Sequence, residues 1–460
     1  MTATTHRTAE EIGRTETGAR LVPALGDQRA AADLQHVDTV LDNGLRVLAV
    51  RKPTVPMVEL RLRIPFGGAG PLHAATAEVL AETILTGTAR RDRIEIDTEL
   101  ALIGGELSTS VDPERLAFTG TALATGLPTL LDVLADALTS ASYVDKEVAR
   151  EAARIVERLA VSRTQPRVIA REALLKHCYG DHPVTREMPR PEDVEKVTAE
   201  AVRALHAEAV LPRGAVLVLV GDIDPEQVVA DIRKALQGWQ SDRTASVLPE
   251  LPELAGGDVL LVPRAGAVQS QIRFIAQGLP RTDPRYPALQ LANLAYGGYF
   301  SSRLVENIRE DKGYTYHAHS GFEFTGSAAT LGVDADTANE ATAAAVLETR
   351  YELGRLALVP PDADELEAVR QYAVGSLVIS TSAQTGLAGQ LAALAFSGLG
   401  VEWLTAHPER LAAVTLDDVA QAALDFFAPA RFTGVVVGDA ASLAPKLAAL
   451  GGFTVGEPAS

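Results

Sequence analysis

A repeated strand-and-turn segment constrains the fold of this chain more than any other feature. Residues 216–222 read VLVLVGD and residues 433–439 read TGVVVGD, and a helical pattern precedes each of them. The offset between the two segments is 217 residues, whereas the repeats of solenoid proteins are roughly 20 to 50 residues long. The sequence therefore predicts two homologous domains.

The hydrophobic patterns within each half predict strands mixed with runs of helices. Residues 214–220 are apolar almost throughout, which is typical of a strand buried on both faces, and Asp42-Asn43-Gly44 predicts a hairpin turn. Residues 57–65 alternate apolar and charged side chains, so we expect a strand with one wet face. The fold class is α+β, with each domain an antiparallel (mixed) β-sheet packed by α-helices.

Composition shifts along the chain predict the domain boundaries. We expect a disordered, polar leader at residues 1–36, an N-terminal domain at 37–240 and a C-terminal domain at 258–450. Residues 241–257 are rich in Ser, Pro, Glu and Gly and are interpreted as a linker. Residues 451–460 are interpreted as a tail.

Charge and cysteine content exclude several classes of function. The net charge is −18, with 60 acidic and 42 basic residues, which argues against a general nucleic-acid or anionic-membrane surface. Cys178 is the single cysteine, so the chain has no internal disulfide and no cysteine-based zinc site. No apolar run approaches eighteen residues and the leader lacks an apolar stretch, so we expect no membrane span, no secretory signal and a cytoplasmic location.

Arg309 and Tyr316 flank a helix-to-strand junction. A helix is predicted at 301–311, Gly313 stops it, and a strand is predicted from residue 314. This spacing allows a guanidinium and a phenol to meet one oxyanion or peptide carbonyl. The alternative is that Arg309 pairs with a nearby acid and Tyr316 fills a core edge. His317 and His319 share one strand face, opposite Tyr316 if the strand is regular, and either line a substrate groove or face solvent.

The order of motifs resembles that of the pitrilysin family of metallopeptidases, which includes insulinase and the mitochondrial processing peptidase. The resemblance spans residues 37–448 and implies a fold that forms half of a clamshell. No single motif carries it, but the ordered set is specific. The motifs are LDNGLRV at 41–47, TGT at 86–88, LIGG at 102–105, YGDHP at 179–183, GD at 221–222, FSSRL at 300–304 and REDKGYTY at 309–316.

The family's zinc helix carries His-x-x-Glu-His shortly before a Gly-Thr pair. Its two imidazoles bind zinc, its Glu activates the zinc-bound water, and a Glu on a later helix is the third protein ligand. Counting back from Gly87-Thr88, the motif positions here are Glu78, Ala81 and Glu82, and the third ligand position falls at Arg158. The resemblance thus implies a degenerate zinc motif, with no metal or other cofactor in this chain.

Two interpretations of the degenerate motif remain. Glu78 and Glu82, with His73 upstream, could form a carboxylate-rich site suited to Mg²⁺ or Mn²⁺. Arg158 would repel such a cation, and the alternative is an Arg158 salt bridge to Glu78 or Glu82 that fills the vacated site.

The resemblance also implies a function. Some bacterial members are heterodimers in which one subunit bears the zinc motif and the other bears a dead motif with an Arg/Tyr pair seven residues apart. Arg309 and Tyr316 match that pair, so we expect a zinc-less subunit that acts with a homologous zinc-bearing partner on extended peptides, leader peptides among them. Arg309, Tyr316, His317 and His319 are the expected substrate-binding residues. The alternative is a catalytically inert scaffold or peptide-binding protein of the same fold.

Overall fold

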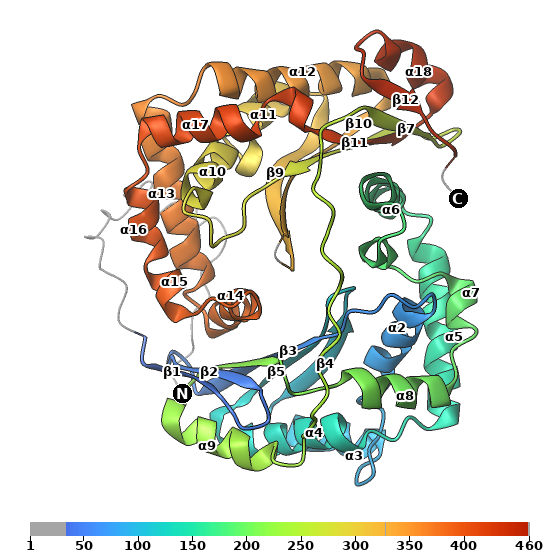
Figure 1. The fold of residues 1–460 in the computed structure, drawn as a ribbon, viewed down its shortest axis with the longest axis vertical. Coiled ribbons are helices and arrows are strands. Elements are labelled where there is room, and N and C mark those ends of the chain that lie inside the picture. Colours follow the sequence, from blue (N-terminus) through green and yellow to red (C-terminus); the bar gives the residue numbers. More distant parts are fainter. Residues whose placement is uncertain (1–33, 327, 459–460) are drawn as a thin grey trace, which may run out of the picture. The chain divides into compact units, whose positions relative to one another are not determined.

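The computed structural model describes residues 34–326 and 328–458, which belong to one compact unit, Leu34–Ser460. The expected disordered leader therefore lies, apart from residues 34–36, outside the described residues. Two six-stranded mixed sheets, each packed by helices, form the framework (Figure 1). In spatial order, the first sheet is β1 (His36–Val40), β2 (Arg46–Arg51), β6 (Val216–Gly221), β3 (Met57–Pro65), β5 (Arg115–Leu123) and β4 (Glu106–Val111). The second is β12 (Phe453–Val455), β7 (Val259–Pro263), β11 (Thr433–Gly438), β8 (Gln269–Gln277), β10 (Ala328–Ala338) and β9 (Thr315–Thr325).

The two sheets have the same strand order, which confirms the predicted duplication. The repeated segments form β6 and β11, and each runs parallel to one neighbour (β2 or β7) and antiparallel to the other (β3 or β8). The outermost strand beside β2 or β7 differs, because β1 pairs antiparallel with β2 whereas β12 pairs parallel with β7. Residues 453–455, expected in a tail, are thus an edge strand of the second sheet.

Each half contributes its own set of helices, and one helix of each half packs on the sheet of the other half, as described below. In the first half they are α2 (His73–Thr83), α3 (Arg93–Leu102), α4 (Leu127–Ser140), α5 (Asp145–Ser162), α6 (Pro166–Tyr179), α7 (Pro191–Val194), α8 (Ala199–Ala209) and α9 (Pro225–Ala235). In the second half they are α10 (Tyr286–Asn293), α11 (Arg303–Val305), α12 (Asn339–Leu358), α13 (Ala363–Ser380), α14 (Gln384–Phe396), α15 (Val401–Thr405), α16 (His407–Ala412), α17 (Leu416–Phe426) and α18 (Ala440–Ala448).

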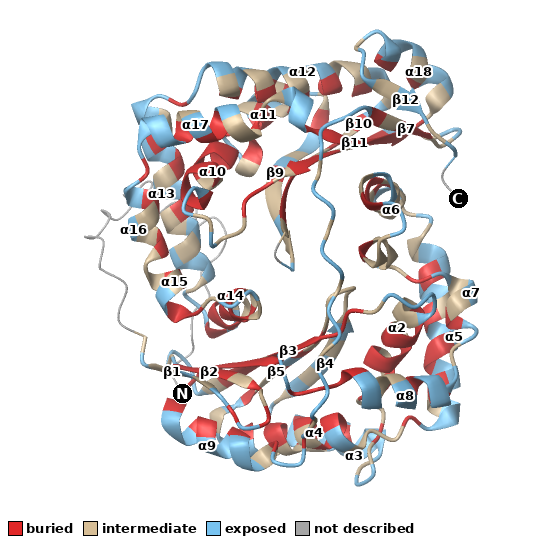
Figure 2. Cartoon of the chain, in the orientation of Figure 1, coloured by how far each residue is buried: buried red, intermediate tan, exposed pale blue. Residues whose placement is uncertain are grey.

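Two helices cross to the other half and cover the remaining sheet faces. Leu387 and Leu391 of α14 are buried against Val216, Val218 and other residues of the first sheet. In the same way, α6 contributes Leu174 to a cluster with β8 and β11 of the second sheet. Figure 2 shows the buried sides of both helices turned toward the sheets. Because β6 and β11 are covered on both faces, all residues of both strands are buried.

The covering by α14 corrects the expectation of a wet face on β3. Glu59 on that face is only 7% exposed. Its carboxylate accepts a hydrogen bond from Thr385, near the start of α14, at 2.7 Å and pairs with Arg61 at 2.8 Å. The alternating charges of β3 thus lie on an inner face, where Glu59 is buried because it is paired with Arg61.

In the described part of the chain, no single helix is long and apolar enough to cross a membrane. The bent pair formed by α14 and residues 401–412 passes that test by length and composition alone, with a bend of 115°.

Candidate functional site

The segment that carries Arg309 departs from a regular α-helix. The predicted helix at 301–311 is the single turn α11 followed by a π-helical segment, Glu306–Asp311. Gly313 adopts φ +63°, and its amide donates to the carbonyl of Arg309 at 3.1 Å, which ends the helix as predicted. The guanidinium of Arg309 lies 4.7 Å from the ring centroid of Phe300, and its Nε is 3.4 Å from Glu310. Arg309 is therefore held against an exposed aromatic ring at a π-helical distortion, a feature common at functional sites.

Tyr316 occupies a β-bulge at the start of β9. Thr315 pairs with Thr337 of β10 and His317 pairs with Asp336, so Tyr316 is the extra residue between two successive pairs. Its side chain is 95% exposed. The alternative in which Tyr316 fills a core edge is therefore wrong. Bulges re-aim side chains and are common beside active sites.

The same bulge decides on which face of β9 the two histidines lie. A regular strand would place Thr315 on the face of His317, yet Thr315 is 6% exposed whereas His317 and His319 are exposed. The extra residue reverses the alternation of side chains between the two faces of the strand. The prediction that Tyr316 lies opposite the two imidazoles assumed a regular strand, so it does not apply here. In the pairing of β9 with β10, His317 lies opposite Asp336 and His319 lies opposite Asp334.

The carboxylates opposite the histidines are paired with an arginine. Arg273 of β8 lies 2.8 Å from Asp336 and 3.5 Å from Asp334. Burial lowers the pKa of His319, although Asp334 acts in the opposite direction. His319 therefore favours its neutral form, which can donate or accept a hydrogen bond at the edge of the sheet.

A guanidinium lies between the two carboxylates of the degenerate zinc motif. Arg158 of α5 is 2.6 Å from Glu78 and 2.7 Å from Glu82 of α2, which confirms the predicted salt bridge. Burial raises the pKa of Glu78 and the neighbouring Glu82 raises it further, while Arg158 partly offsets both effects. Arg154, four residues before Arg158, also binds Glu82 at 3.0 Å. Arg154 was not among the residues predicted from the sequence, although its spacing of four residues from Arg158 places it on the same helix face.

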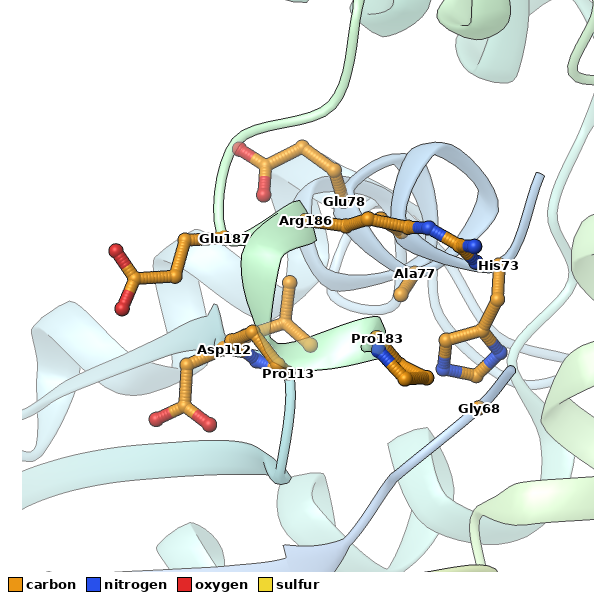
Figure 3. A pocket seen from close by; sticks show the side chains of 11 residues that line it. Gly68, His73, Ala77, Glu78, Asp112, Pro113, Pro183, Arg186 and Glu187 are labelled. Atoms are coloured by element: carbon orange, nitrogen blue, oxygen red, sulfur yellow. The ribbon is translucent and has the colours of Figure 1, made fainter. Parts of the chain in front are cut away.

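His73 does not complete a carboxylate-rich metal site. Its Nε2 lies 2.9 Å from the carbonyl oxygen of Phe66. The imidazole packs so closely on Gly68 that a Cβ at that position would lie 2.2 Å from Nδ1. Figure 3 shows His73 directed toward Gly68 and the carboxylate of Glu78 directed away, on opposite sides of a small cavity of about 20 Å³.

The side chains at the zinc-motif positions do not fit a zinc ion. Neither Glu78 nor Glu82 supplies an imidazole, Ala81 has no carboxylate to activate water, and Arg158 brings a fixed positive charge where the third ligand would be. Among residues 34–326 and 328–458, no group of three or more His, Cys, Asp or Glu side chains could hold a metal ion. No catalytic step is therefore assigned to a metal in this chain.

Two α+β domains of the same strand order, a degenerate zinc helix, a partly exposed Arg309 and an exposed Tyr316 define the chain as metallopeptidase-like. Residues 46–192 match the family model described as insulinase (peptidase family M16), and residues 196–372 match the model described as peptidase M16 inactive domain. The chain belongs to the pitrilysin/insulinase family of peptidases. It is a non-catalytic member, because the residues that bind zinc and activate water are replaced at Glu78, Ala81 and Glu82.

Curated relatives and solved structures agree with this assignment. An uncharacterized zinc protease of Streptomyces coelicolor is 26% identical over 69% of this chain and 70% of that protein. A probable inactive metalloprotease of Bacillus subtilis is 28% identical over 29% of this chain and 31% of that protein. The fold is similar to a peptidase M16 inactive domain from Pseudomonas fluorescens, with a TM-score of 0.80 and 21% identity, covering 88% of this chain and 98% of that one. A protease from Helicobacter pylori has a TM-score of 0.78 at 16% identity, covering 88% and 99%.

Proposed function

We propose that this chain is the non-catalytic subunit of a heterodimeric zinc metalloendopeptidase. Its homologous partner carries the His-x-x-Glu-His motif and the zinc ion, and this chain supplies Arg309 and Tyr316 to the partner's active site. The exposure of Tyr316, at 95%, is the observation that carries the proposal. Within the described residues the Tyr316 hydroxyl has no hydrogen-bond partner, so it is free to donate to a group on another molecule.

The proposed chemistry is stabilisation of the tetrahedral oxyanion. Tyr316 donates a hydrogen bond to that oxygen, and Arg309 orients the phenol or the substrate carbonyl. Donors held in place before the reaction stabilise developing charge without reorganisation during the chemical step. The stack of Arg309 on Phe300 and the glycine-terminated turn at Gly313 support such preorganisation.

The proposed substrate is an extended peptide bound by β-addition. Both β4 and β9 are edge strands, and β9 is 11 residues long and carries Tyr316, His317 and His319. An edge strand offers unpaired backbone groups to an extended segment. Short or unfolded peptides, including leader peptides, satisfy this requirement because their backbone can become fully extended without breaking a fold.

Mixing experiments with a zinc-bearing relative encoded beside this chain would test the proposal. Proteolysis of a fluorogenic peptide should require both chains and should fall about 10²- to 10³-fold with Tyr316→Phe. Arg309→Ala should lower kcat as well, whereas Arg93→Ala, an exposed arginine on α3, serves as a control. Full activity from the partner alone, or undiminished activity with both site variants, would show that the chain is a scaffold or a peptide-binding protein instead.

A further inference from the structure

Arg61 of β3, Arg273 of β8 and Arg171 of α6, the helix that covers the second sheet, each have a carboxylate partner. Such pairing offsets the cost of removing a guanidinium from water. The paired side chains are Arg61 with Glu59 at 2.8 Å, Arg171 with Glu187 at 2.6 Å and with Glu323 at 2.8 Å, and Arg273 with Asp336 at 2.8 Å.

Arg63 is an exception on the same face of β3 as Arg61. It lies between Ala117 of β5 and Val216 of β6, and within the described residues its guanidinium makes no hydrogen bond or ion pair. Burial lowers the pKa of Arg63 to about 10, and the nearby charge of Arg115 acts in the same direction. An arginine in this setting costs folding free energy unless an anion joins it.

Two further arginines are placed beside Arg63. Arg115 faces Pro65 across the β3–β5 pair, which makes it the diagonal neighbour of Arg63 on the same sheet face. Arg281 comes from the other half of the chain, in the loop after β8, and is close enough to Arg63 to depress its pKa. The negative charge of Asp112 also lies near Arg63, but the Asp112 carboxylate is already paired with Arg115 at 2.8 Å.

Aromatic rings hold two of these guanidinium groups. The guanidinium carbon of Arg281 lies 3.5 Å from the ring centroid of Phe324, and that of Arg115 lies 5.6 Å from the centroid of Phe396. Arg281 makes no ion pair with the described residues, and burial lowers its pKa, an effect that the hydrogen bond with Tyr286 partly offsets. Stacking on a ring fixes a guanidinium without neutralising it, so its N–H groups remain available to a ligand.

A cavity of about 400 Å³ adjoins the cluster. Arg115, Phe324 and Phe396 line it, together with Pro65 and apolar side chains of the linker, Val247, Leu248 and Leu251. Two carboxylates also line it. Glu114 accepts a hydrogen bond from the backbone of Gly326, and burial raises its pKa, while Glu250 is exposed to solvent. Of the three arginines, Arg115 lines the cavity itself. Arg281 lies against the ring of Phe324, which forms part of the wall, and Arg63 is the diagonal neighbour of Arg115. Unpaired guanidinium groups thus adjoin a cavity with an apolar wall.

We propose that Arg63, Arg115 and Arg281, here termed the arginine site, bind a carboxylate of a peptide held in this cavity. The carboxylate is either the C-terminus of the peptide or an acidic side chain. The planar fork of arginine matches a carboxylate, and the rings of Phe324 and Phe396 pack against an apolar side chain next to it. This inference deepens the proposed function and rests on it, because it presumes that the chain binds peptides.

Binding of three labelled peptides to the full chain would test the arginine site. They are a fluorescein-labelled ten-residue peptide ending in leucine with a free carboxylate, the same peptide as its C-terminal amide, and the amide with glutamate as the penultimate residue. We expect the free acid, the glutamate peptide or both to bind at least tenfold more tightly than the plain amide, because hydrogen bonds to charged groups contribute that much. Which of the two is preferred identifies the source of the carboxylate.

Matched variants decide whether the preference comes from the arginine site. Arg63→Gln and Arg281→Gln should each abolish the preference, and Arg63→Gln should keep or raise the Tm because it removes an uncompensated charge. Arg61→Gln, on the same face two residues earlier, should lower the Tm by leaving Glu59 unpaired and should keep the preference. A preference that survives both Arg63→Gln and Arg281→Gln, or one that is lost in folded Arg61→Gln, would overturn the proposal.

A second measurement separates this inference from the proposed function. N-acetyl-leucine should raise the Tm of the wild-type chain, N-acetyl-leucinamide should not, and the difference should vanish in Arg63→Gln. If all three peptides bind equally well, peptide binding stands and the arginine site is wrong. If no peptide binds but N-acetyl-leucine stabilises in an Arg63-dependent way, the arginine site stands and the proposed function fails. No stabilisation by N-acetyl-leucine and no preference among the peptides would refute the site.

Discussion

The hydroxyl of Thr315 donates to the carbonyl oxygen of Asp336 at 2.6 Å and accepts from the amide of His317 at 3.0 Å. These two bonds close the β-bulge around Tyr316. Thr315 is only 6% exposed, and its hydroxyl thereby keeps the phenol of Tyr316 out of the core.

Replacing Thr315 tests this relationship. Thr315→Val removes the hydroxyl at nearly constant shape and leaves the amide of His317 without its partner, so we expect a loss of about 1–2 kcal/mol in the free energy of unfolding. Thr315→Ser keeps the hydroxyl and should lose less. Urea unfolding measures both variants, and equal losses would argue that packing of the methyl group, and not the hydroxyl, maintains the bulge.

Tyr316→Phe should leave the stability of the chain unchanged to within about 0.5 kcal/mol, because substitutions of exposed side chains without partners have small effects. Its activity with a zinc-bearing partner should nevertheless fall. Thermal unfolding of the variant alone, measured beside the mixed activity assay, separates the two effects. A substantial drop in Tm would show that Tyr316 has a structural role.

The Arg158 bridge should stabilise the contact between α2 and α5. Arg158→Ala leaves Glu78 and Glu82 facing each other, and we expect a loss of about 1–2 kcal/mol, less than for a fully buried pair because the Arg158 side chain is 43% exposed. The double variant Arg158→Ala with Glu78→Gln should recover part of that loss. Denaturant unfolding checks both variants, and additive losses would mean that the two side chains are not coupled.

Restoring the zinc ligands should create a metal site. The combination Glu78→His, Ala81→Glu, Glu82→His and Arg158→Glu places two imidazoles and a carboxylate on helices that already lie within salt-bridge distance. Elemental analysis should then find close to one zinc per chain, against none in the wild type, and added zinc should raise the Tm of the variant alone. Stoichiometric zinc in the wild-type chain would contradict the assignment of the motif positions.

A buried histidine should make stability depend on pH. Burial, with Arg410 and Arg281 nearby, lowers the pKa of His407 to about 4 from an ordinary value of 6.5, and its Nε2 lies 2.8 Å from Gln290. The unfolded chain therefore binds a proton that the folded chain does not between pH 6.5 and pH 4. Stability should fall by about 3 kcal/mol as the pH drops through this window.

His407→Gln can still donate to Gln290 but has no charge to gain, so it should reduce this pH dependence. Urea unfolding at pH 7 and pH 4.5 compares the two proteins. An unchanged slope in the variant would assign the pH dependence to other groups.

Local patterns predicted most elements of the fold, since hairpin turns, helix caps and apolar periodicity act over a few residues. The hairpin at Asp42-Asn43-Gly44 and the glycine stop at Gly313 both formed where expected. Strand β12 was missed because its pairing with β7 joins residues almost 200 positions apart, and a three-residue strand has too little pattern of its own. The covering of Glu59 by α14 depends on the same kind of distant contact.

The sequence by itself predicted that this chain lacks the zinc chemistry of its family, because Glu78, Ala81 and Glu82 occupy the positions at which the family resemblance places two imidazoles and a carboxylate. Only the tertiary structure decided where Tyr316 points, since the register between β9 and β10 creates the bulge and strand alternation alone predicts the other face. Likewise, Arg281 comes near enough to Arg63 to lower its pKa only because the loop after β8 folds against the first sheet. Charges brought together from distant positions leave no local pattern in a sequence, and the cost of burying a guanidinium without a partner supports the proposed arginine site.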